Sequence, residues 1–239
     1  MKYSLPTFLS SLVLLCMTHI SVSTAADLDS LNIMTEEFPP FNYSYDGNPS
    51  GLSVDLLIKA SAAVGSPITE KDINIVAWAR AYKTTLSGPN TMLFSTTRTE
   101  QREDLFKWAG PIGQNRTVVW AKKTSNIGQI VDMSAIDKKI VVIRDSVDDQ
   151  MTVKANVSTK LITRASKPDS AAKMLSTNRV DLWAYNELTA IEILKRNGQN
   201  LDDYEIVHVL SSSDLYFAFS KDVDDSVVQL LQKGIDMVK

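Results

Sequence analysis

Cysteine and histidine are almost absent from this sequence of 239 residues, which has one cysteine, Cys16, and two histidines, His19 and His208. Cys16 and His19 fall within an N-terminal segment that is typical of a cleaved export signal, so the rest of the chain has no cysteine and a single histidine. Disulfides, cysteine nucleophiles and zinc sites of the His/Cys type are therefore excluded there. His208 lies in the apolar run 206–210, which favours a strand residue over a catalytic base.

Long apolar runs are also scarce, and the one that stands out covers residues 8–17, shortly after an N-terminal lysine. It is too short to span a bilayer as a permanent helix, and the small residues at 23–26 suit signal cleavage. We predict that residues 1–26 are a signal peptide and that the mature protein is soluble. A lipoprotein anchored at Cys16 is disfavoured, because Leu15 stands where a small residue is expected.

Basic charge is not in excess either. Without the signal segment, which holds one lysine and no acid, the chain has 24 basic and 28 acidic residues, a net charge of −4. It also has no basic stripe, and both features argue against nucleic acid as a partner. About 213 residues remain, which suits one large domain or two small lobes. No low-complexity tract, internal repeat or Pro/Ser-rich linker divides them.

Strand-like and helix-like segments alternate along the chain. The first half has strands near 31–34, 73–76 and 92–95, with helices near 54–64 and 78–86 between them. This order favours a parallel sheet with helices on both faces. The second half continues the alternation, with strands near 117–121, 139–143, 160–163, 180–185, 204–210 and 215–220 and helices near 147–156, 168–176, 187–197 and 223–238.

We therefore predict an α/β protein of two lobes, each a mostly parallel sheet flanked by helices. Lobe 1 comprises residues 27–115 plus 212–239, and lobe 2 comprises residues 116–211. The chain crosses between them twice, near 110–116 and near 211–216. Two lobes joined in this way leave a cleft, which is a default place for a ligand.

Residues 95–111, STTRTEQREDLFKWAGP, carry two arginines, Arg98 and Arg102, among small hydroxyl residues. They follow a predicted buried strand, whose end can offer hydroxyls and backbone N–H groups. A guanidinium fork beside such oriented donors is what a carboxylate needs. A bare arginine-rich turn is more commonly a surface turn whose charges pair with each other. The residues alone leave both interpretations open, and they leave the choice between the two arginines open.

The same stretch resembles the signature of the bacterial periplasmic solute-binding proteins of the polar amino-acid group, solute-binding protein family 3. These are the binding components of ABC importers. In that family a Thr-x-x-Arg turn follows a strand that ends in small residues, and here the turn runs from Thr99 to Arg102. A phenylalanine-containing segment then leads into the hinge, as residues 106–111 do here. The segment 51–56 also matches, and the resemblance extends from about Leu31 to the C-terminus.

The resemblance implies a type II periplasmic-binding fold and a periplasmic location. It also implies a small-molecule ligand with a carboxylate, a membrane permease of an ABC transporter as partner, a monomer, and no cofactor, metal or enzymatic activity. Members of the family usually run a little further than Lys239, so the C-terminus is expected to be either short or truncated. A periplasmic sensor and a dehydratase-like enzyme on the same scaffold remain alternatives.

The resemblance also implies a ligand site, formed by Phe38, Trp78, Ser95, Thr97, Arg102, Arg144 and Asn186. Phe38 and Trp78 match two aromatics that sandwich the ligand, with Phe41 or Tyr43 as alternatives to Phe38 in the proline-rich loop 36–43. Arg102 is favoured as the clamp for the carboxylate. Ser95 and Thr97 match donors beside that clamp, and Arg144 matches a basic position in a loop that opens a helix of lobe 2.

One part of the site departs from the family pattern. Amino-acid binders typically hold the ligand ammonium with two acids, whose positions are occupied here by Thr35 and Asn186. Neither residue carries a charge. Glu36, Glu37 and Glu187 are adjacent and are candidates to replace them. Otherwise the ligand lacks an ammonium group, so the sequence supports a small molecule with a carboxylate and leaves an amino acid open.

Overall fold

The protein is described from a computed structural model, which describes residues 27–239. The predicted signal peptide, residues 1–26, lies outside the described residues. Between residues 27 and 239, no helix is long and apolar enough to cross a membrane.

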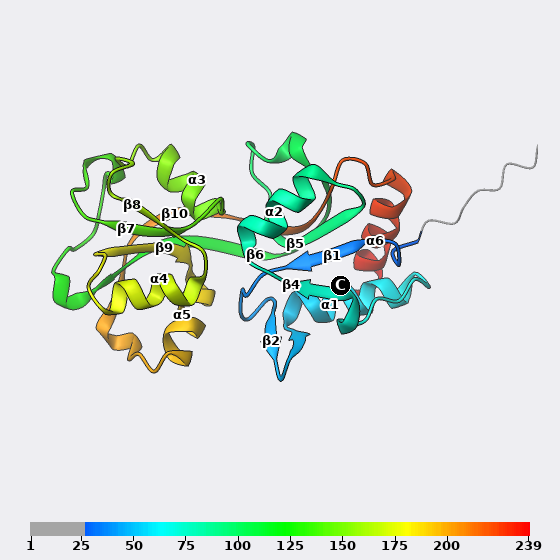
Figure 1. Ribbon diagram of the computed structural model, residues 1–239, viewed down its shortest axis with the longest axis horizontal. Coiled ribbons are helices and arrows are strands. Elements are labelled where there is room, and N and C mark those ends of the chain that lie inside the picture. The colour runs from blue at the N-terminus through cyan, green and yellow to red at the C-terminus, as the bar shows by residue number, and fades with distance from the viewer. Residues whose placement is uncertain (1–26) are drawn as a thin grey trace, which may run out of the picture.

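One eight-stranded sheet runs through both lobes (Figure 1). Its strands are β1 (Asn32–Thr35), β4 (Ile73–Ile75), β5 (Thr91–Thr97), β6 (Lys107–Lys122), β7 (Ile140–Ile143), β8 (Ile162–Ala165), β9 (Leu182–Asn186) and β10 (Tyr204–Phe219). Their spatial order is β4-β1-β5-β10-β6-β9-β7-β8. The two ends of the sheet are parallel, with β4, β1 and β5 in lobe 1 and β9, β7 and β8 in lobe 2. The predicted α/β architecture of two lobes is confirmed.

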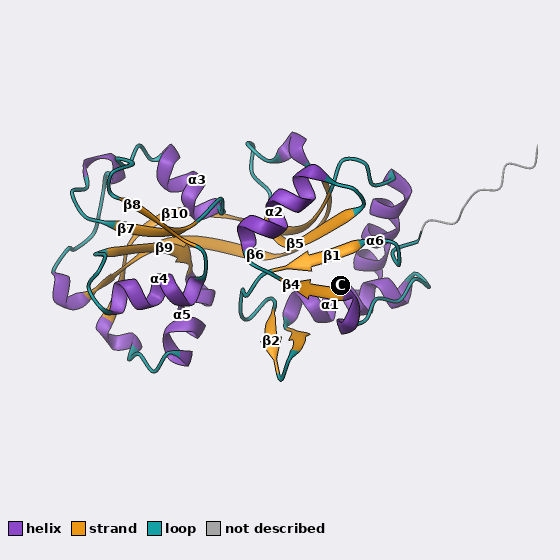
Figure 2. Cartoon of the chain, viewed as in Figure 1, coloured by secondary structure: helices purple, strands orange, loops and turns teal. Residues whose placement is uncertain are grey.

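The helices cover the sheet on both faces in each lobe (Figure 2). Lobe 1 has α1 (Leu52–Ala63), α2 (Trp78–Ser87) and α6 (Asp225–Val238), and lobe 2 has α3 (Val147–Lys154), α4 (Pro168–Ser176) and α5 (Glu187–Arg196). A small hairpin of β2 (Tyr43–Tyr45) and β3 (Asn48–Ser50) projects from lobe 1. The hairpin was not predicted, because Pro49 and the polar residues around it are typical of a loop.

Strand side chains alternate between the two faces of the sheet and so pack into separate hydrophobic cores. In β5, Met92 and Phe94 pack with α1 and α6, whereas Leu93 between them packs in the cluster that contains α2. In β7, Val141 points to the cluster under α4 and α5, and Val142 points to the opposite face. This period of two is the ordinary geometry of a strand, and because both faces of β7 are buried, all four of its residues are apolar.

The last helix packs closely against the first. In α6 the buried residues include Leu231, Gly234 and Ile235, a spacing that places them on one face of the helix. A Cβ atom at Gly234 would lie 2.2 Å from the carbonyl oxygen of Ala60 in α1. A glycine at this position therefore allows the two backbones to touch, which ties the end of the chain to lobe 1.

Two long strands connect the lobes. β6 and β10 pair antiparallel along 16 residues each and run from one lobe into the other (Figure 1). The sequence predicted two separate runs, 204–210 and 215–220, where β10 is continuous. The prediction was wrong because Ser211 to Asp214 are polar, yet they keep their ladder partners on β6 despite bulges on either side. The predicted lobe boundaries fall within these two strands and stay a prediction.

Candidate functional site

A cavity of about 20 Å³ lies between the lobes. Six of the seven predicted site residues line it, namely Phe38, Trp78, Ser95, Thr97, Arg102 and Asn186. Such a volume has room for about one water molecule, whereas pockets for small molecules usually measure roughly 300 Å³ or more. The lobes are thus closed on these residues, and a larger ligand needs them to move apart before it enters.

Arg144 is the predicted residue that the structure does not bring into the cavity. It follows β7, and its side chain is exposed. The next residue, Asp145, has φ of 61°, so the chain turns sharply before α3 begins. This turn directs the carbonyl of Asp145 toward lobe 1 and brings Ser146 and Asp148 to the cavity instead. The sequence located the loop, but not which of its residues faces inward.

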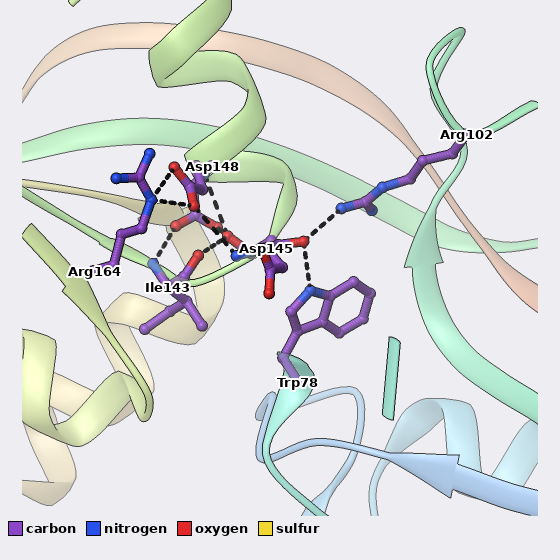
Figure 3. Close-up of polar contacts among 8 residues, drawn as sticks. Trp78, Arg102, Ile143, Asp145, Asp148 and Arg164 are labelled. Atoms are coloured by element: carbon purple, nitrogen blue, oxygen red, sulfur yellow. Dashed lines mark hydrogen bonds and ion pairs between the residues drawn. The ribbon is translucent and has the colours of Figure 1, made fainter. Parts of the chain in front are cut away.

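Arg102 is a buried cation that reaches across the cleft. It is 1% exposed, and its guanidinium group lies 5.3 Å from the ring centre of Trp78 and 5.0 Å from that of Tyr82. Nη1 donates to the carbonyl of Thr97 at 3.2 Å, and Nη2 donates to the carbonyl of Asp145 in lobe 2 at 3.3 Å (Figure 3). Burial lowers its pKa, yet an arginine remains protonated. Nε has no partner among the described residues.

Arg98, the alternative clamp, lies elsewhere. It is half-buried, pairs with Glu103, and its guanidinium group lies over the rings of Trp108 and Tyr216. It does not line the cavity. The geometry therefore favours Arg102, because Arg98 already has a carboxylate partner at a more exposed position.

The hydroxyl and amide residues of the site are tied to each other. Asn186 Nδ2 donates to Asn115 Oδ1 at 2.6 Å, and Asn115 Nδ2 donates to Thr97 Oγ1 at 2.7 Å. Asn186 Oδ1 also accepts from the backbone N–H of Thr189 and so caps α5. This chain links β5 of lobe 1 to α5 of lobe 2 through β6. Asn186 lines the cavity, but its amide groups already serve this network.

Ser95 is held in an unusual backbone conformation. Its φ is 57°, which is uncommon for a residue other than glycine, and it lies in β5 where the pairing with β10 shifts register. Its hydroxyl donates to Ser53 Oγ at 2.9 Å. Ser53 lies in the first turn of α1, whose N-cap is Gly51. Its hydrogen bond with Ser95 fixes the bulged end of β5, which lines the same cavity as Arg102.

The two predicted aromatics belong both to the cavity wall and to a hydrophobic core. Phe38 stacks on Phe41 and meets Tyr185 edge-on, and all three are buried. Trp78 stacks on Tyr82, and its Nε1 donates to the carbonyl of Asp145 at 2.9 Å (Figure 3). Neither Phe41 nor the half-buried Tyr43 lines the cavity.

Two carboxyl groups from opposite lobes face the cavity. Thr35 is buried and its hydroxyl donates to the carbonyl of Phe94, so the acid at this edge of lobe 1 is its neighbour Glu36. Burial raises the pKa of Glu36 well above its usual value, and the negative charge of Asp148 adds to the rise. Glu37 points elsewhere, since its Oε1 accepts from the backbone N–H of Ser44.

Asp148 was not among the predicted site residues. Its Oδ2 accepts from the backbone N–H of Ile143 at 2.8 Å, and its Oδ1 lies 2.5 Å from Ser146 Oγ. The same Ser146 oxygen lies 2.6 Å from the carbonyl of Ile143, which cannot donate. Ser146 has one proton, so both short contacts are satisfied when Asp148 is protonated. Burial accordingly raises the pKa of Asp148 to about 7.

The sequence had no signal that separated Asp148 from Asp149, since both are acids in the first turn of a helix. The structure separates them by direction. Asp149 is held by Arg164, whose Nε lies 2.8 Å from Oδ2, away from the cavity. Between residues 27 and 239, no group of three or more His, Cys, Asp or Glu side chains is arranged to hold a metal ion.

Residues 31–239 match the family described as bacterial extracellular solute-binding proteins, family 3. The chain belongs to this family. No curated protein matches the chain closely enough to count as a relative. The match of the family extends over both lobes and includes every residue of the cavity.

Solved structures with the same architecture come from proteins of more than one role. A histidine kinase sensor domain has a TM-score of 0.75 at 16% identity, with 88% of this chain and 91% of that chain covered. The arginine-, lysine-, histidine-binding protein ArtJ from Geobacillus stearothermophilus has a TM-score of 0.75 at 19% identity, with 87% and 89% covered. An ABC uptake transporter substrate-binding protein from Streptococcus pneumoniae, with bound histidine, has a TM-score of 0.74 at 19% identity, with 88% and 87% covered. At these identities the likeness establishes the fold.

Trp78 offers a test of whether its contact across the cleft contributes to closure in this family 3 protein. In Trp78→Phe the aromatic face remains, but the donor to the carbonyl of Asp145 is lost. We expect ligand affinity to fall about fivefold, because one net hydrogen bond of about 1 kcal/mol disappears from the closed state. Titration calorimetry measures the affinity, and small-angle scattering of the ligand-free protein should show a larger radius of gyration.

Trp183→Phe is the matched control. Trp183 is fully buried in lobe 2, and its Nε1 has no hydrogen-bond partner among the described residues. The same substitution there removes an indole without removing a contact between the lobes, so affinity should stay near that of the wild type. Equal losses of affinity in both variants would indicate that Trp78 acts only through core packing.

Proposed function

We propose that this protein captures a small polar ligand, an amino acid or a related small carboxylate, and delivers it to an ABC-type importer from the periplasm. The observation that carries the proposal is Arg102, a buried cation in a closed cavity between two lobes, beside Ser95 and Thr97. A buried charge needs a partner of opposite sign. The lobes open to admit the ligand, and its carboxylate becomes that partner when they close around it.

Capture requires movement of the lobes, and the connections suit such movement. The lobes are joined by β6 and β10, and the contacts across the cleft include the bonds from Trp78 and Arg102 to the Asp145 carbonyl. Opening breaks these bonds and hydrates Arg102, and closure on a ligand restores a dry site. The closed form is the natural surface for a permease, and the protein acts as a monomer in this scheme.

A sensor is the second candidate, because a histidine kinase sensor domain shares the fold over 88% of this chain. Such a sensor would bind the same class of ligand, and a membrane partner would recognise its closed form. A dehydratase-like enzyme is disfavoured, because the family is one of binding proteins. The observation that would support an enzyme is the pair of carboxyl groups of Glu36 and Asp148, whose raised pKa values suit proton transfer.

The test is a ligand screen by thermal shift on a chain that lacks residues 1–26, unfolded and refolded to strip bound ligand. The panel contains amino acids, other small carboxylates and amines. A true ligand at a hundredfold excess over Kd should stabilise the fold by about 2.7 kcal/mol. Chromatography of the hit after incubation should return it unchanged, whereas a new product would favour the enzyme. Silence across the panel from a folded protein would overturn the proposal.

A further inference from the structure

Closure of the cleft brings together two acids that are far apart in the sequence. Glu36 lies in the loop after β1 of lobe 1, and Asp148 lies in the first turn of α3 of lobe 2. Both line the closed cavity, and they are 8% and 2% exposed. Arg102 is the one cation among the described residues that line this cavity. The closed form therefore buries two carboxyl groups beside a single positive charge, which is costly unless a carboxyl group is neutral.

The surroundings of Asp148 offer its carboxyl group no cation of its own. The titratable or charged groups near it are Glu36 and Arg102 from lobe 1 and Asp149 and Tyr185 from lobe 2. Arg102 directs its two Nη groups to backbone carbonyls, and Asp149 is paired with Arg164. Tyr185 stays a neutral phenol, because burial raises its pKa. Within residues 27–239, the hydrogen-bond partners of the Asp148 carboxyl group are therefore neutral.

Ser146 identifies the oxygen that holds the proton. Its Oγ lies 2.5 Å from Asp148 Oδ1 and 2.6 Å from the carbonyl oxygen of Ile143. The hydroxyl has one proton and donates it to that carbonyl, so Asp148 Oδ1 must supply the proton of the other bond. Oδ2 accepts from the backbone N–H of Ile143 at 2.8 Å. The closed form thus satisfies a neutral acid at both oxygens.

Opening of the lobes changes this balance. Lobe 1 closes over Asp148 with residues that line the same cavity, among them Phe38 and Trp78. When lobe 1 moves away, water reaches the carboxyl group and solvates its ionised form. The Ser146 hydroxyl is then free to turn and donate to the carboxylate. The open form therefore favours the ionised acid, because the burial that disfavours its charge is gone.

We propose that closing of the lobes takes up a proton from the solvent at Asp148 and that opening returns it, so that acid closes the cleft and alkali opens it. A bound carboxylate strengthens this coupling, because it draws on the same arginine that faces both acids. A captured ligand is therefore held more firmly in acid and released more readily as the pH rises. This inference goes beyond the proposed function, since the proton belongs to the movement of the lobes and needs no ligand.

The test follows the distance between the lobes in the ligand-free protein, with pH as the only variable. Residues 27–239 contain no cysteine, so Lys83→Cys and Lys173→Cys together place one dye on each lobe. Both lysines are exposed and lie in α2 and α4, whose first residues line one space between the lobes. The labelled chain lacks residues 1–26 and is refolded to strip bound ligand. Single-molecule energy transfer then gives the ratio of closed to open molecules.

The closed-to-open ratio of the wild type should fall at least about tenfold between about pH 5 and about pH 8. The reason is that the pKa of Asp148 is about 7 in the closed form and 3.8 ordinarily, so the closed form loses its advantage as the pH rises through this range. Asp148→Asn imitates the neutral acid, and its fall should be at least about tenfold smaller. Glu36→Gln, which removes the other acid that closure buries, should also reduce the fall. In the matched control Asp149→Asn the fall should persist, because Asp149 pairs with Arg164 and does not line the cavity.

A ratio in the wild type that stays constant between these pH values, or rises with pH, overturns the proposal. When nearly all molecules are closed, the measurement is repeated in Trp78→Phe, which lacks one contact across the cleft, and a constant ratio there overturns it as well. A fall that Asp148→Asn leaves intact overturns the assignment of the proton to Asp148. Thermal melting of each variant at each pH identifies a change that arises from unfolding.

The outcomes are independent of the proposed function, because no ligand is used. A ligand screen without a hit leaves the coupling between protons and closure standing. A closed-to-open ratio that ignores pH leaves ligand capture standing and removes only its coupling to protons.

Discussion

Replacing Arg102 with alanine is expected to raise the dissociation constant of the ligand about 100-fold or more, because two charge-assisted hydrogen bonds are lost together. The fold should survive, since Trp78 still donates to the carbonyl of Asp145 and the other interlobe connections are untouched. Arg102→Lys keeps the charge but not the planar fork, so its affinity should lie between that of the wild type and that of Arg102→Ala. Titration calorimetry with the ligand found in the screen measures all three proteins.

Arg98→Ala is the control for this prediction. Arg98 is four residues away and lies over two aromatic rings, but it pairs with Glu103 outside the cavity. Its removal should leave affinity within about twofold, since exposed ion pairs contribute little. Retained affinity in Arg102→Ala together with a loss in Arg98→Ala would move the carboxylate clamp to Arg98 and contradict the geometry.

The order of the main helices and sheet strands was predictable from the sequence, because several of them have an apolar period and end signals of their own. Residues 168–176 illustrate this, since a proline at the start and apolar residues at helical spacing define α4 without tertiary information. The strands β6 and β10, which connect the lobes, were harder to predict from the sequence. Ser211 to Asp214 are polar because they lie between the lobes, and only pairing with β6 makes them a strand.

Residues of the site could be predicted only where their position in the sequence determines which way the side chain points. Arg102 follows a buried strand by a short turn, so its neighbourhood could be inferred. Arg144 and Asp148 lie in one loop, and which of them faces the cavity depends on the left-handed turn at Asp145, which no residue type demands. Glu36 and Asp148 face the same cavity only because two lobes that are distant in sequence close on each other. No local sequence pattern encodes that closure.

Asp148 makes stability depend on pH in a direction opposite to that of most paired carboxylates. The pKa of its carboxyl group is about 7 in the folded protein and starts from an ordinary value of 3.8. Between these values the folded state holds a proton that the unfolded state has released, so stability falls as pH rises through this window. The loss from this one group is about 4 kcal/mol in total. Glu36, whose pKa is also raised, acts in the same direction.

Asp148→Asn should remove this part of the pH dependence. The variant amide can donate to Ser146 Oγ and accept from the backbone N–H of Ile143, which reproduces the bonds of the protonated acid. We expect the unfolding free energy of the wild type to drop by about 2.5 kcal/mol or more between about pH 5 and about pH 8. That of Asp148→Asn should drop by about 2.5 kcal/mol less.

Urea unfolding of ligand-free protein at a series of pH values measures both slopes, with Glu36→Gln and the double variant beside them. The double variant should be the least sensitive to pH, because it lacks both carboxyl groups that closure buries. A slope in Asp148→Asn equal to that of the wild type would mean that Asp148 is already ionised in solution. Since burial in the closed cleft is what raises its pKa, such a result would indicate that the ligand-free protein is open and that closure awaits the ligand.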